Sequence, residues 1–371
     1  MFDALVIGAG PAGSAAARLL AQAGWRIALV EKAEFPRRKV CGEFISATTM
    51  PVLASCGIAD TFLAAAGPPV TQVGLYAGEA MLADRCDRVW GRALGREHLD
   101  TMLRDAAVAA GAQLFQPAEI VSVEKQGENF AGALDNGAVI AARHVIAACG
   151  SWNPRGPFAV STDDAKSSDL FAFKAHFSAG RLPAGLMPLL AFPGGYGGLV
   201  MSDHGRTSLS CCIRRAALTH ARQRHGGRAA EAVLAHILET TKGARAALGA
   251  AALDGAFLSV GPIHPGIRPR LRDGVFCTGN IAGEAHPVIA EGISMAIQSS
   301  GLLAKLLIAH RGEDYAHAWT RRFATRIRAA SVFAHLAMRG PTRAASLAVI
   351  KRAPVLLGWG ARLSGKTPIS A

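Results

Sequence analysis

The 371-residue sequence lacks the features typical of membrane-spanning, disulfide-stabilised and metal-binding proteins. No run of about 18 apolar residues is free of charges and helix breakers, so we expect no membrane-spanning helix. No basic and apolar leader precedes the first expected strand, and we predict no signal peptide. The seven cysteines show no repeated spacing and no Cys-x-x-Cys pair. This favours reduced thiols in a cytoplasmic protein and predicts no metal site.

Charged residues are scarce as well, at 18% of the chain, whereas half of the residues are hydrophobic. This composition excludes a disordered chain and predicts a large buried core. The length suits two domains or one elaborated α/β domain.

Acidic residues are absent from the end of the sequence. Between Arg321 and Ala371 there are ten lysines and arginines and no aspartate or glutamate, in a chain whose net charge is +13. A basic face on an apolar segment favours contact with an anionic membrane surface. A solvated basic face on a docked helix stays open as an equal alternative. We do not expect nucleic-acid binding, because no aromatic-rich reading surface accompanies the charge.

The first thirty-one residues contain the most informative pattern of the sequence. Phe2–Ile7 is an apolar strand, Gly8-Ala9-Gly10-Pro11-Ala12-Gly13 follows at once, and an Ala/Leu-rich helix runs to Gly24. A second strand, Arg26–Val30, ends in Glu31. In this pattern the first glycine permits the turn, the second admits a pyrophosphate, and the third lets helix and strand pack closely. Glu31 stands where a carboxylate accepts ribose hydroxyls. The sequence therefore predicts a dinucleotide site.

The remainder of the chain predicts an α/β fold with an inserted antiparallel sheet. We expect a loop at 35–46 and a flexible turn at Gly194–Gly198. The expected helices are 48–56, 96–110, 214–249 in several pieces, and 291–310. The expected strands are 113–115, 119–125, 144–148, 170–177, 186–192, 198–202, 207–213 and 271–278, with further strands between 70 and 92 and a hairpin turn at 135–137.

Four segments together resemble the superfamily of flavoprotein hydroxylases, geranylgeranyl reductases and halogenase-like enzymes, which have the p-hydroxybenzoate hydroxylase fold. They are the Gly8–Gly13 loop with Glu31, Cys41-Gly42-Glu43, Arg96 at the head of its helix, and the block 279–298. The resemblance implies a Rossmann-like FAD-binding domain, an inserted antiparallel β-sheet substrate domain and a helical C-terminus. We assign 1–68, 90–165 and 265–312 to the first domain, 69–89 and 166–264 to the second, and 313–371 to a basic helical segment.

The resemblance implies FAD as the cofactor, together with a set of binding residues. These residues are Gly8, Gly10, Pro11, Ala12, Gly13, Glu31, Lys32, Lys39, Cys41, Arg96, Gly279, Asn280, Pro287, Gly292 and Ile293. The family usually has Gly-Asp at Gly279-Asn280 and Asp-Gly at Cys149-Gly150. The second departure leaves the electron donor open between NAD(P)H and a separate reductase.

Cys41 and His286 are the candidate catalytic residues. The alternative for Cys41 is a small apolar residue in a packed turn, and His286 is equally compatible with a wall of the site. Cys41-Gly42-Glu43 is similar to a segment of the reductase branch. No Trp-x-Trp motif occurs among tryptophans 25, 90, 152, 319 and 359, so we do not expect halogenation. Lys174 and His176 share one strand face and are expected to face solvent. Seven apolar residues of the expected strands have two possible roles: they line an apolar substrate site, or they form part of the core. They are Phe171, Phe173, Phe177, Met187, Leu189, Leu190 and Phe192.

Our first functional hypothesis is an FAD-dependent monooxygenase that hydroxylates an apolar aromatic or polyketide-derived compound through a flavin C4a-hydroperoxide. The second is a reductase of isoprenoid or other C=C bonds. The third is a flavin-carrying protein without catalytic activity that binds a membrane surface or a partner. The sequence favours a small apolar substrate but does not distinguish the reactions.

Overall fold

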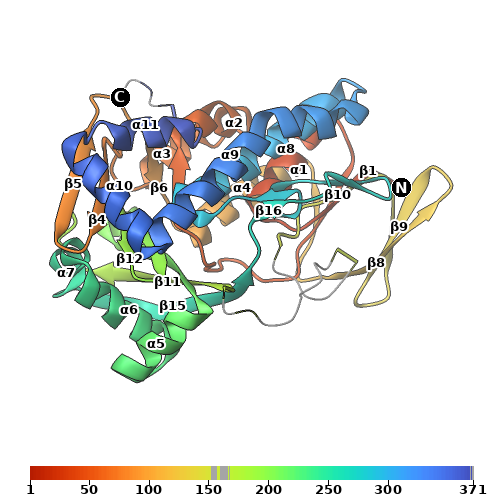
Figure 1. Cartoon of the computed structure of the whole chain (residues 1–371). Coiled ribbons are helices and arrows are strands. Elements are labelled where there is room, and N and C mark those ends of the chain that lie inside the picture. The colour runs from red at the N-terminus through yellow and green to blue at the C-terminus, as the bar shows by residue number, and fades with distance from the viewer. Residues whose placement is uncertain (152–156, 159–165, 167, 368, 370–371) are drawn as a thin grey trace.

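The computed structural model describes residues 1–151, 157–158, 166, 168–367 and 369 (Figure 1). Trp152 and the expected domain boundary at residue 165 lie outside the described residues. Two large sheets organise the chain, and long helices near its C-terminus cross from one sheet to the other.

The first sheet joins segments from both ends of the sequence. Its strands follow the order β17-β18-β10-β1-β2-β7, parallel except for β17, and β9 and β8 extend it from β10. The bounds of these strands are β1 Phe2–Ile7, β2 Ile27–Val30, β7 Gln113–Phe115, β8 Ile120–Gln126, β9 Asn129–Leu134, β10 Val139–Ala147, β17 Leu271–Arg272 and β18 Val275–Cys277. The central strands β1 and β2 are apolar because both of their faces are buried, as expected for a parallel sheet.

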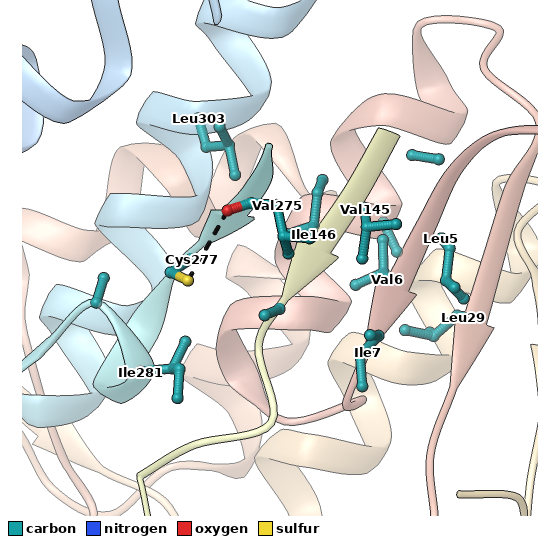
Figure 2. Close-up of a cluster of buried hydrophobic side chains, with 14 of the residues drawn as sticks. Leu5, Val6, Ile7, Leu29, Val145, Ile146, Val275, Cys277, Ile281 and Leu303 are labelled. Atoms are coloured by element: carbon teal, nitrogen blue, oxygen red, sulfur yellow. Dashed lines mark hydrogen bonds between the residues drawn. The ribbon is translucent and has the colours of Figure 1, made fainter. Parts of the chain in front are cut away.

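Helices α1 (Pro11–Gln22), α4 (Arg96–Ala109) and α8 (Gly292–Ile308) pack around this sheet. Figure 2 shows Leu5 and Val6 of β1 beside Val145 of β10, and Leu303 of α8 near β18. These side chains belong to one buried cluster. This core fixes the carboxyl ends of the strands, where ligands bind in α/β proteins.

The second sheet has seven strands in the order β15-β11-β14-β13-β12-β4-β5. All neighbours are antiparallel except β12 and β4. The strands are β4 Gln72–Ala77, β5 Ala80–Arg85, β11 Leu170–Ser178, β12 Leu186–Phe192, β13 Gly195–Met201, β14 Thr207–Arg214 and β15 Ala252–Ile263. The helices α5 Arg215–His225, α6 Ala229–Thr240 and α7 Lys242–Leu248 lie on the same side of the fold, and α6 and α7 contribute to the core on one face of the sheet. This is the expected antiparallel insertion.

Smaller elements complete the two domains. The short strands are β3 Phe44–Ser46 paired with β6 Gly91–Ala93, and β16 Gly266–Ile267 paired with β19 Gly283–Glu284. The short helices are α2 Met50–Ser55 and α3 Ala59–Ala65.

The C-terminal segment forms α9 (Tyr315–Met338), α10 (Gly340–Arg352) and α11 (Leu356–Leu363). Helix α9 contacts α8 and then β12 and β13, and α11 packs on β4 and β5. The chain then returns to the second domain, where Ile369 and Val89 exchange two backbone hydrogen bonds of 2.9 and 3.0 Å. Within the described part of the chain, no helix has the length and apolarity needed to span a bilayer.

Most of the expected elements are present, but α3 and the short strands β3, β16 and β19 were not predicted. The expected strand 271–278 is a hairpin, because Asp273 and Gly274 adopt positive φ between β17 and β18. The expected turn Gly194–Gly198 is wrong, because β13 begins at Gly195. A side chain at Gly197 would collide with the backbone of β14, so close strand packing explains this glycine. Strand β15 was not predicted, because only one of its residues is buried.

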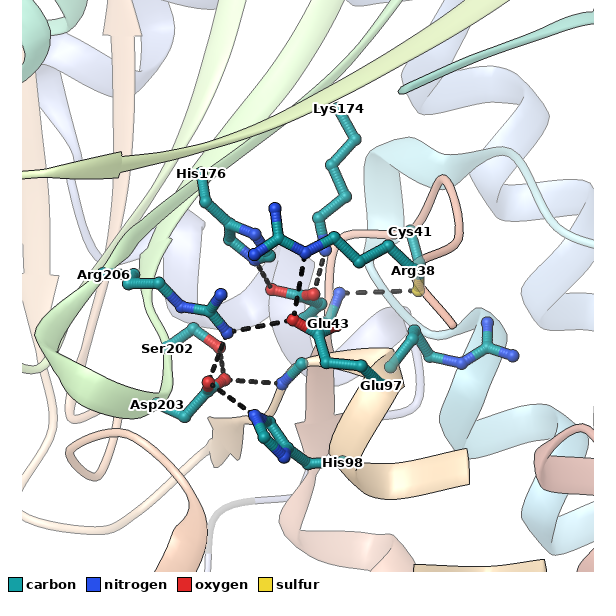
Figure 3. Close-up of polar contacts among 12 residues, drawn as sticks. Arg38, Cys41, Glu43, Glu97, His98, Lys174, His176, Ser202, Asp203 and Arg206 are labelled. Carbon is teal, nitrogen blue, oxygen red and sulfur yellow. Dashed lines mark hydrogen bonds and ion pairs between the residues drawn. The ribbon is translucent and has the colours of Figure 1, made fainter. Parts of the chain in front are cut away.

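The expectation that Lys174 and His176 face solvent is also wrong. The alternation of β11 was read correctly, since Phe173 and Phe177 lie in the core that includes residues of α6 and α7. However, the opposite face is covered by the loop that contains Glu43, and both basic side chains are only 2% exposed. Figure 3 shows them converging on the Glu43 carboxylate, which pairs with the Lys174 ammonium and lies 2.8 Å from Nε2 of His176.

Glu43 keeps its charge although it is fully buried. Burial alone would raise its pKa, but the hydrogen bond to His176 and the positive charge of Lys174 outweigh burial and lower the pKa to about 2. Glu43 also has φ 63°, a conformation that is uncommon for a residue with a side chain. The ionic contacts therefore hold the loop of the first domain in a fixed conformation against the second sheet.

A second set of ion pairs continues this contact between the domains (Figure 3). Arg206, beyond the end of β13, pairs with Asp203 and lies 3.1 Å from the carboxylate of Glu97 in the first turn of α4. Arg38 reaches the same carboxylate at 3.4 Å. Asp203 in turn accepts a hydrogen bond of 2.7 Å from the backbone N–H of Gly95. The loop at 38–43 and the start of α4 are thus tied to the second sheet at several points.

We predict that Glu43→Gln lowers the free energy of unfolding by roughly 3–5 kcal/mol, because it leaves the buried Lys174 charge unpaired. The pKa of Glu43 is lower in the folded protein than its ordinary value of 4.5. Its stabilisation is therefore fully present above that value and is lost as the pH falls towards about 2. Urea denaturation across this window should show that loss in the wild type and a flatter profile in Glu43→Gln.

The matched control is Glu239→Gln, which breaks an exposed ion pair with Arg224. Exposed pairs contribute about 0–1 kcal/mol, so this variant should unfold much like the wild type. Equal stability of the Glu43 and Glu239 variants would contradict the role assigned to Glu43.

Candidate active site

A cavity of about 610 Å³ extends from the Gly8–Gly13 loop, between the two domains, to the C-terminal helices. Most of the predicted cofactor-binding and catalytic residues line it. Gly13 and His286 are the exceptions, and the lining members are Gly8, Gly10, Pro11, Ala12, Glu31, Lys32, Lys39, Cys41, Arg96, Gly279, Asn280, Pro287, Gly292 and Ile293. The structure thus brings together residues that are up to 285 positions apart in the sequence.

Gly10 and Gly13 have different surroundings. Gly10 caps the N-terminus of α1, and the nearest atom to a Cβ placed there is Nη2 of Arg96, at 3.8 Å. A Cβ at Gly13 would collide with the carbonyl oxygen of Gly8. Gly13 is therefore required for close packing of helix and strand, whereas Gly10 leaves open space in front of a helix N-terminus, where anions bind.

Three cations, Arg37, Lys39 and Arg96, surround this opening. Arg96 makes two hydrogen bonds of 2.6 and 2.7 Å to Asp100, and that carboxylate outweighs burial and raises the pKa of Arg96. Burial lowers the pKa of Lys39, and the nearby charges of Arg37 and Arg96 lower it further. The cluster carries a positive potential towards the cavity, because its three cations exceed the charges of Glu31 and Asp100.

Glu31 lies at the end of β2, as predicted. Its carboxylate accepts hydrogen bonds from the backbone N–H groups of Ala9 (2.8 Å) and Ala33 (2.9 Å), and Arg37 lies 3.0 Å away. Glu31 is therefore held rigidly at the cavity wall. Arg37 was missed by sequence reasoning, although the run Arg37-Arg38-Lys39 was a signal for a cationic loop.

The head of α8 forms the opposite part of the cavity wall. Gly292 is the first residue of α8, and a Cβ placed on it would meet no atom within 4 Å. The helix therefore presents its N-terminal backbone to open space. Glu291 precedes it and is fully buried, where Ser46 donates a hydrogen bond of 3.2 Å to it. The backbone oxygen of Asn280 accepts a hydrogen bond of 2.7 Å from Arg268.

Lys366, from the end of the chain, reaches the same place. Its Nζ lies 3.2 Å from Oε1 of Glu291 and also donates to the backbone oxygen of Ile289 and the hydroxyl of Ser364. Lys366 is 3% exposed and lines the cavity. Burial raises the pKa of Glu291 and lowers the pKa of Lys366, so each group depends on the other for its charge. No spacing in the sequence links the two residues.

Tyr196 and His286 form a polar pair beside the cavity. The hydroxyl of Tyr196, which lines the cavity, is hydrogen-bonded to Nδ1 of His286 at 3.2 Å. Burial lowers the pKa of His286 to about 4, so its imidazole is neutral near pH 7. Burial also raises the pKa of Tyr196. Sequence reasoning found His286 but missed Tyr196, which lies within the expected glycine turn.

Cys41 and Cys149 lie on different parts of the cavity wall. Cys41 is half-buried and faces Arg96, and its Sγ accepts a hydrogen bond of 3.4 Å from the backbone N–H of Glu43. Cys149 lies near the glycine loop, and burial raises its pKa to about 11. Cys149 is therefore a protonated thiol at neutral pH.

The far half of the cavity is apolar. Of the seven apolar residues weighed from the sequence, Met187 and Leu189 line it, whereas Phe171, Phe173, Phe177, Leu190 and Phe192 belong to the core on the other face of the sheet. Helices α10 and α11 close this half with Leu347, Ile350 and Leu357. The described residues thus provide a polar end suited to a nucleotide and an apolar end suited to a hydrophobic substrate.

Comparison with known proteins identifies relatives of several activities. The menaquinone reductase of Mycolicibacterium smegmatis is 31% identical over 164 residues, which are 42% of this chain and 39% of that protein. The rifampicin monooxygenase of Rhodococcus hoagii is 28% identical over 149 residues, 39% of this chain and 31% of that protein. The matched segments thus span at most about two fifths of these relatives.

The fold is shared with solved flavoenzyme structures. The myxobacterial chondrochloren halogenase CndH superposes with a TM-score of 0.77 at 22% identity, covering 92% of this chain and 84% of that one. At this identity the likeness concerns the fold alone. The FAD binding domain family matches residues 1–318. The chain therefore belongs to the FAD binding domain family.

Proposed function

We propose that the protein is a monooxygenase that hydroxylates an apolar phenolic or other aromatic compound in the apolar half of the cavity. The observation that carries this proposal is the Tyr196–His286 pair, which supplies a proton acceptor next to an apolar pocket. The relatives have several activities and do not single out one reaction. The proposal therefore rests on the geometry of this cavity.

The residues around the cavity fit FAD. Gly10 leaves open space beside the cations Arg37, Lys39 and Arg96, which suits a pyrophosphate. The rigid Glu31 carboxylate suits the adenosine ribose. Gly292 leaves open space at the head of α8, where the helix N-terminus favours negative charge on the flavin. When bound there, FAD supplies the redox chemistry with oxygen.

Tyr196 and His286 would control the proton of a phenolic substrate. A phenol that donates to the Tyr196 hydroxyl can lose its proton to this hydroxyl as Tyr196 passes its own proton to neutral His286. Deprotonation raises electron density in the aromatic ring and prepares it for attack by an electrophilic oxygen donor. Neutral His286 has a free position for the proton of a phenol, whereas reduction of a C=C bond needs a proton donor at this position.

C=C reduction is the second candidate, and the partial identity to menaquinone reductase favours it. The two reactions differ in their need for oxygen. The photoreduced protein should be mixed with an alkylphenol in the presence of ¹⁸O₂ and, separately, without oxygen. Incorporation of ¹⁸O into the product is expected. Reduction of an isoprenoid quinone without oxygen, combined with no labelled phenol product, would favour the second candidate instead.

Tyr196→Phe should slow alkylphenol hydroxylation about 10²- to 10⁴-fold, the usual contribution of a positioned proton-transfer group. FAD content and the affinity for the alkylphenol should change little. In the wild type, the rate should rise with pH through about 4, because only neutral His286 accepts the proton. His286→Asn should remove this dependence. An unchanged hydroxylation rate in Tyr196→Phe would rule out the assigned proton transfer.

Gly10→Val should abolish FAD retention without unfolding the protein, because its side chain enters the proposed pyrophosphate space. Gly13→Val is the matched comparison and should prevent folding, because its side chain collides with the backbone of Gly8. Flavin absorbance measures retention, and circular dichroism measures folding. A folded Gly10→Val protein with a full complement of FAD would show that the pyrophosphate lies elsewhere.

Lys366→Met should lower the flavin reduction potential by roughly 30 mV, equal to about 1.4 kcal/mol for a two-electron couple. The variant removes a cation from the head of α8, and at a pH well above the raised pKa of Glu291 it leaves that carboxylate charged, which opposes formation of an anionic reduced flavin. The double variant Lys366→Met/Glu291→Gln removes both charges and should return the potential towards the wild-type value. Equal potentials in all three proteins would place the flavin ring away from this ion pair.

A further inference from the structure

The outer face of the last two helices combines exposed apolar side chains with positive charge. Figure 1 shows α10 and α11 beside β4, β5 and β12. Val355, which directly precedes α11, and Trp359 and Leu363 within it are spaced by four and therefore lie on one face. They are 53%, 59% and 64% exposed. Val349 of α10, 54% exposed, adds to this set. We call these four residues the apolar stripe.

Basic residues flank the apolar stripe. Lys351, Arg352 and Arg362 are exposed, and residues 340–371 contain five lysines and arginines but no aspartate or glutamate. Two copies of the protein that met through this face would bring like charges together. Cationic side chains around an exposed tryptophan and aliphatic residues are instead suited to the interface of an anionic bilayer.

The inner face of the same segment closes the apolar half of the cavity. The structure describes every residue of α10, and none of them is buried. Leu347 and Ile350 face the cavity, as Leu357 does from the start of α11. A single helix layer, about 10–12 Å across, therefore separates the cavity from the apolar stripe.

We propose that α10 and α11 dock on an anionic lipid bilayer through the apolar stripe and its flanking cations, and that the cavity receives a lipid-soluble substrate from this side. Trp359 and Leu363 enter the interface, while Lys351, Arg352 and Arg362 contact lipid phosphates. Membrane docking follows from the exposure of the apolar stripe and the charge around it, and it does not depend on the proposed hydroxylation. Entry of the substrate from the membrane rests on the proposed function, in which the substrate is apolar.

The test uses the full-length FAD-loaded protein and two kinds of vesicle, phosphatidylcholine alone and phosphatidylcholine mixed with phosphatidylglycerol. Cosedimentation should show binding to the mixed vesicles that weakens as salt is added. Lys351→Glu/Arg352→Glu should weaken binding by more than tenfold, since each basic residue near an anionic surface contributes about 1 kcal/mol. The matched control, Lys125→Glu/Lys305→Glu, reverses two exposed lysines outside this segment and should bind much better.

Trp359→Ser/Leu363→Ser tests the apolar stripe and should abolish vesicle binding while retaining FAD and the melting temperature. Its control is Val139→Ser, at an equally exposed apolar residue of β10. Lipids brominated on their acyl chains should quench the fluorescence of the wild type but not of Trp359→Ser. The absence of wild-type binding to mixed vesicles, or equal binding by the stripe variant, would overturn the proposal. If the protein self-associates without vesicles and Trp359→Ser/Leu363→Ser removes this association, the face binds a second copy of the protein instead.

Discussion

The buried Glu43 carboxylate is the interaction on which the geometry of the site depends. It belongs to the loop of the first domain that lines the cavity, while Lys174 and His176 belong to the second sheet. An ion pair in a dry interface is a weak source of net stability, because desolvation offsets much of the attraction. Its effect is instead to exclude other arrangements, since any shift of the loop leaves a buried charge unpaired. Cys41 and the cations beside it are placed by this constraint.

The head of α8, where we propose that the flavin binds, depends in the same way on a second buried ion pair. Glu291 precedes α8, and Lys366 comes from the end of the chain. The first pair fixes the two domains against each other, and the second fixes the C-terminal segment against the head of α8. Both pairs border the cavity, so the positions of its walls are determined by charges rather than by apolar packing alone. An apolar cavity wall would tolerate small displacements that a buried charge does not.

Prediction from the sequence was accurate for features that depend on residues close in the sequence and failed for those that depend on distant ones. The Gly8–Gly13 loop and Glu31 were predicted correctly in position, because their turn, helix and strands are local. The alternation of β11 correctly separated Lys174 from Phe173, but alternation says which residues share a face and not what covers that face. Lys366 could not be predicted, because its partner lies 75 residues away and a lone lysine in a basic segment has no distinguishing neighbours.

The C-terminal segment shows the physical cost of closing a cavity with helices. A helix normally buries one face in a core, yet α10 has a cavity on its inner side and solvent on its outer side. Few buried contacts then stabilise its centre, and such segments open at low free energy. The segment is held mainly at its ends, by α9 on one side and by Lys366 and the Ile369–Val89 pairing on the other. Contact with a bilayer would cover the outer face without filling the cavity. The same surface can therefore stabilise the segment and leave the substrate site open.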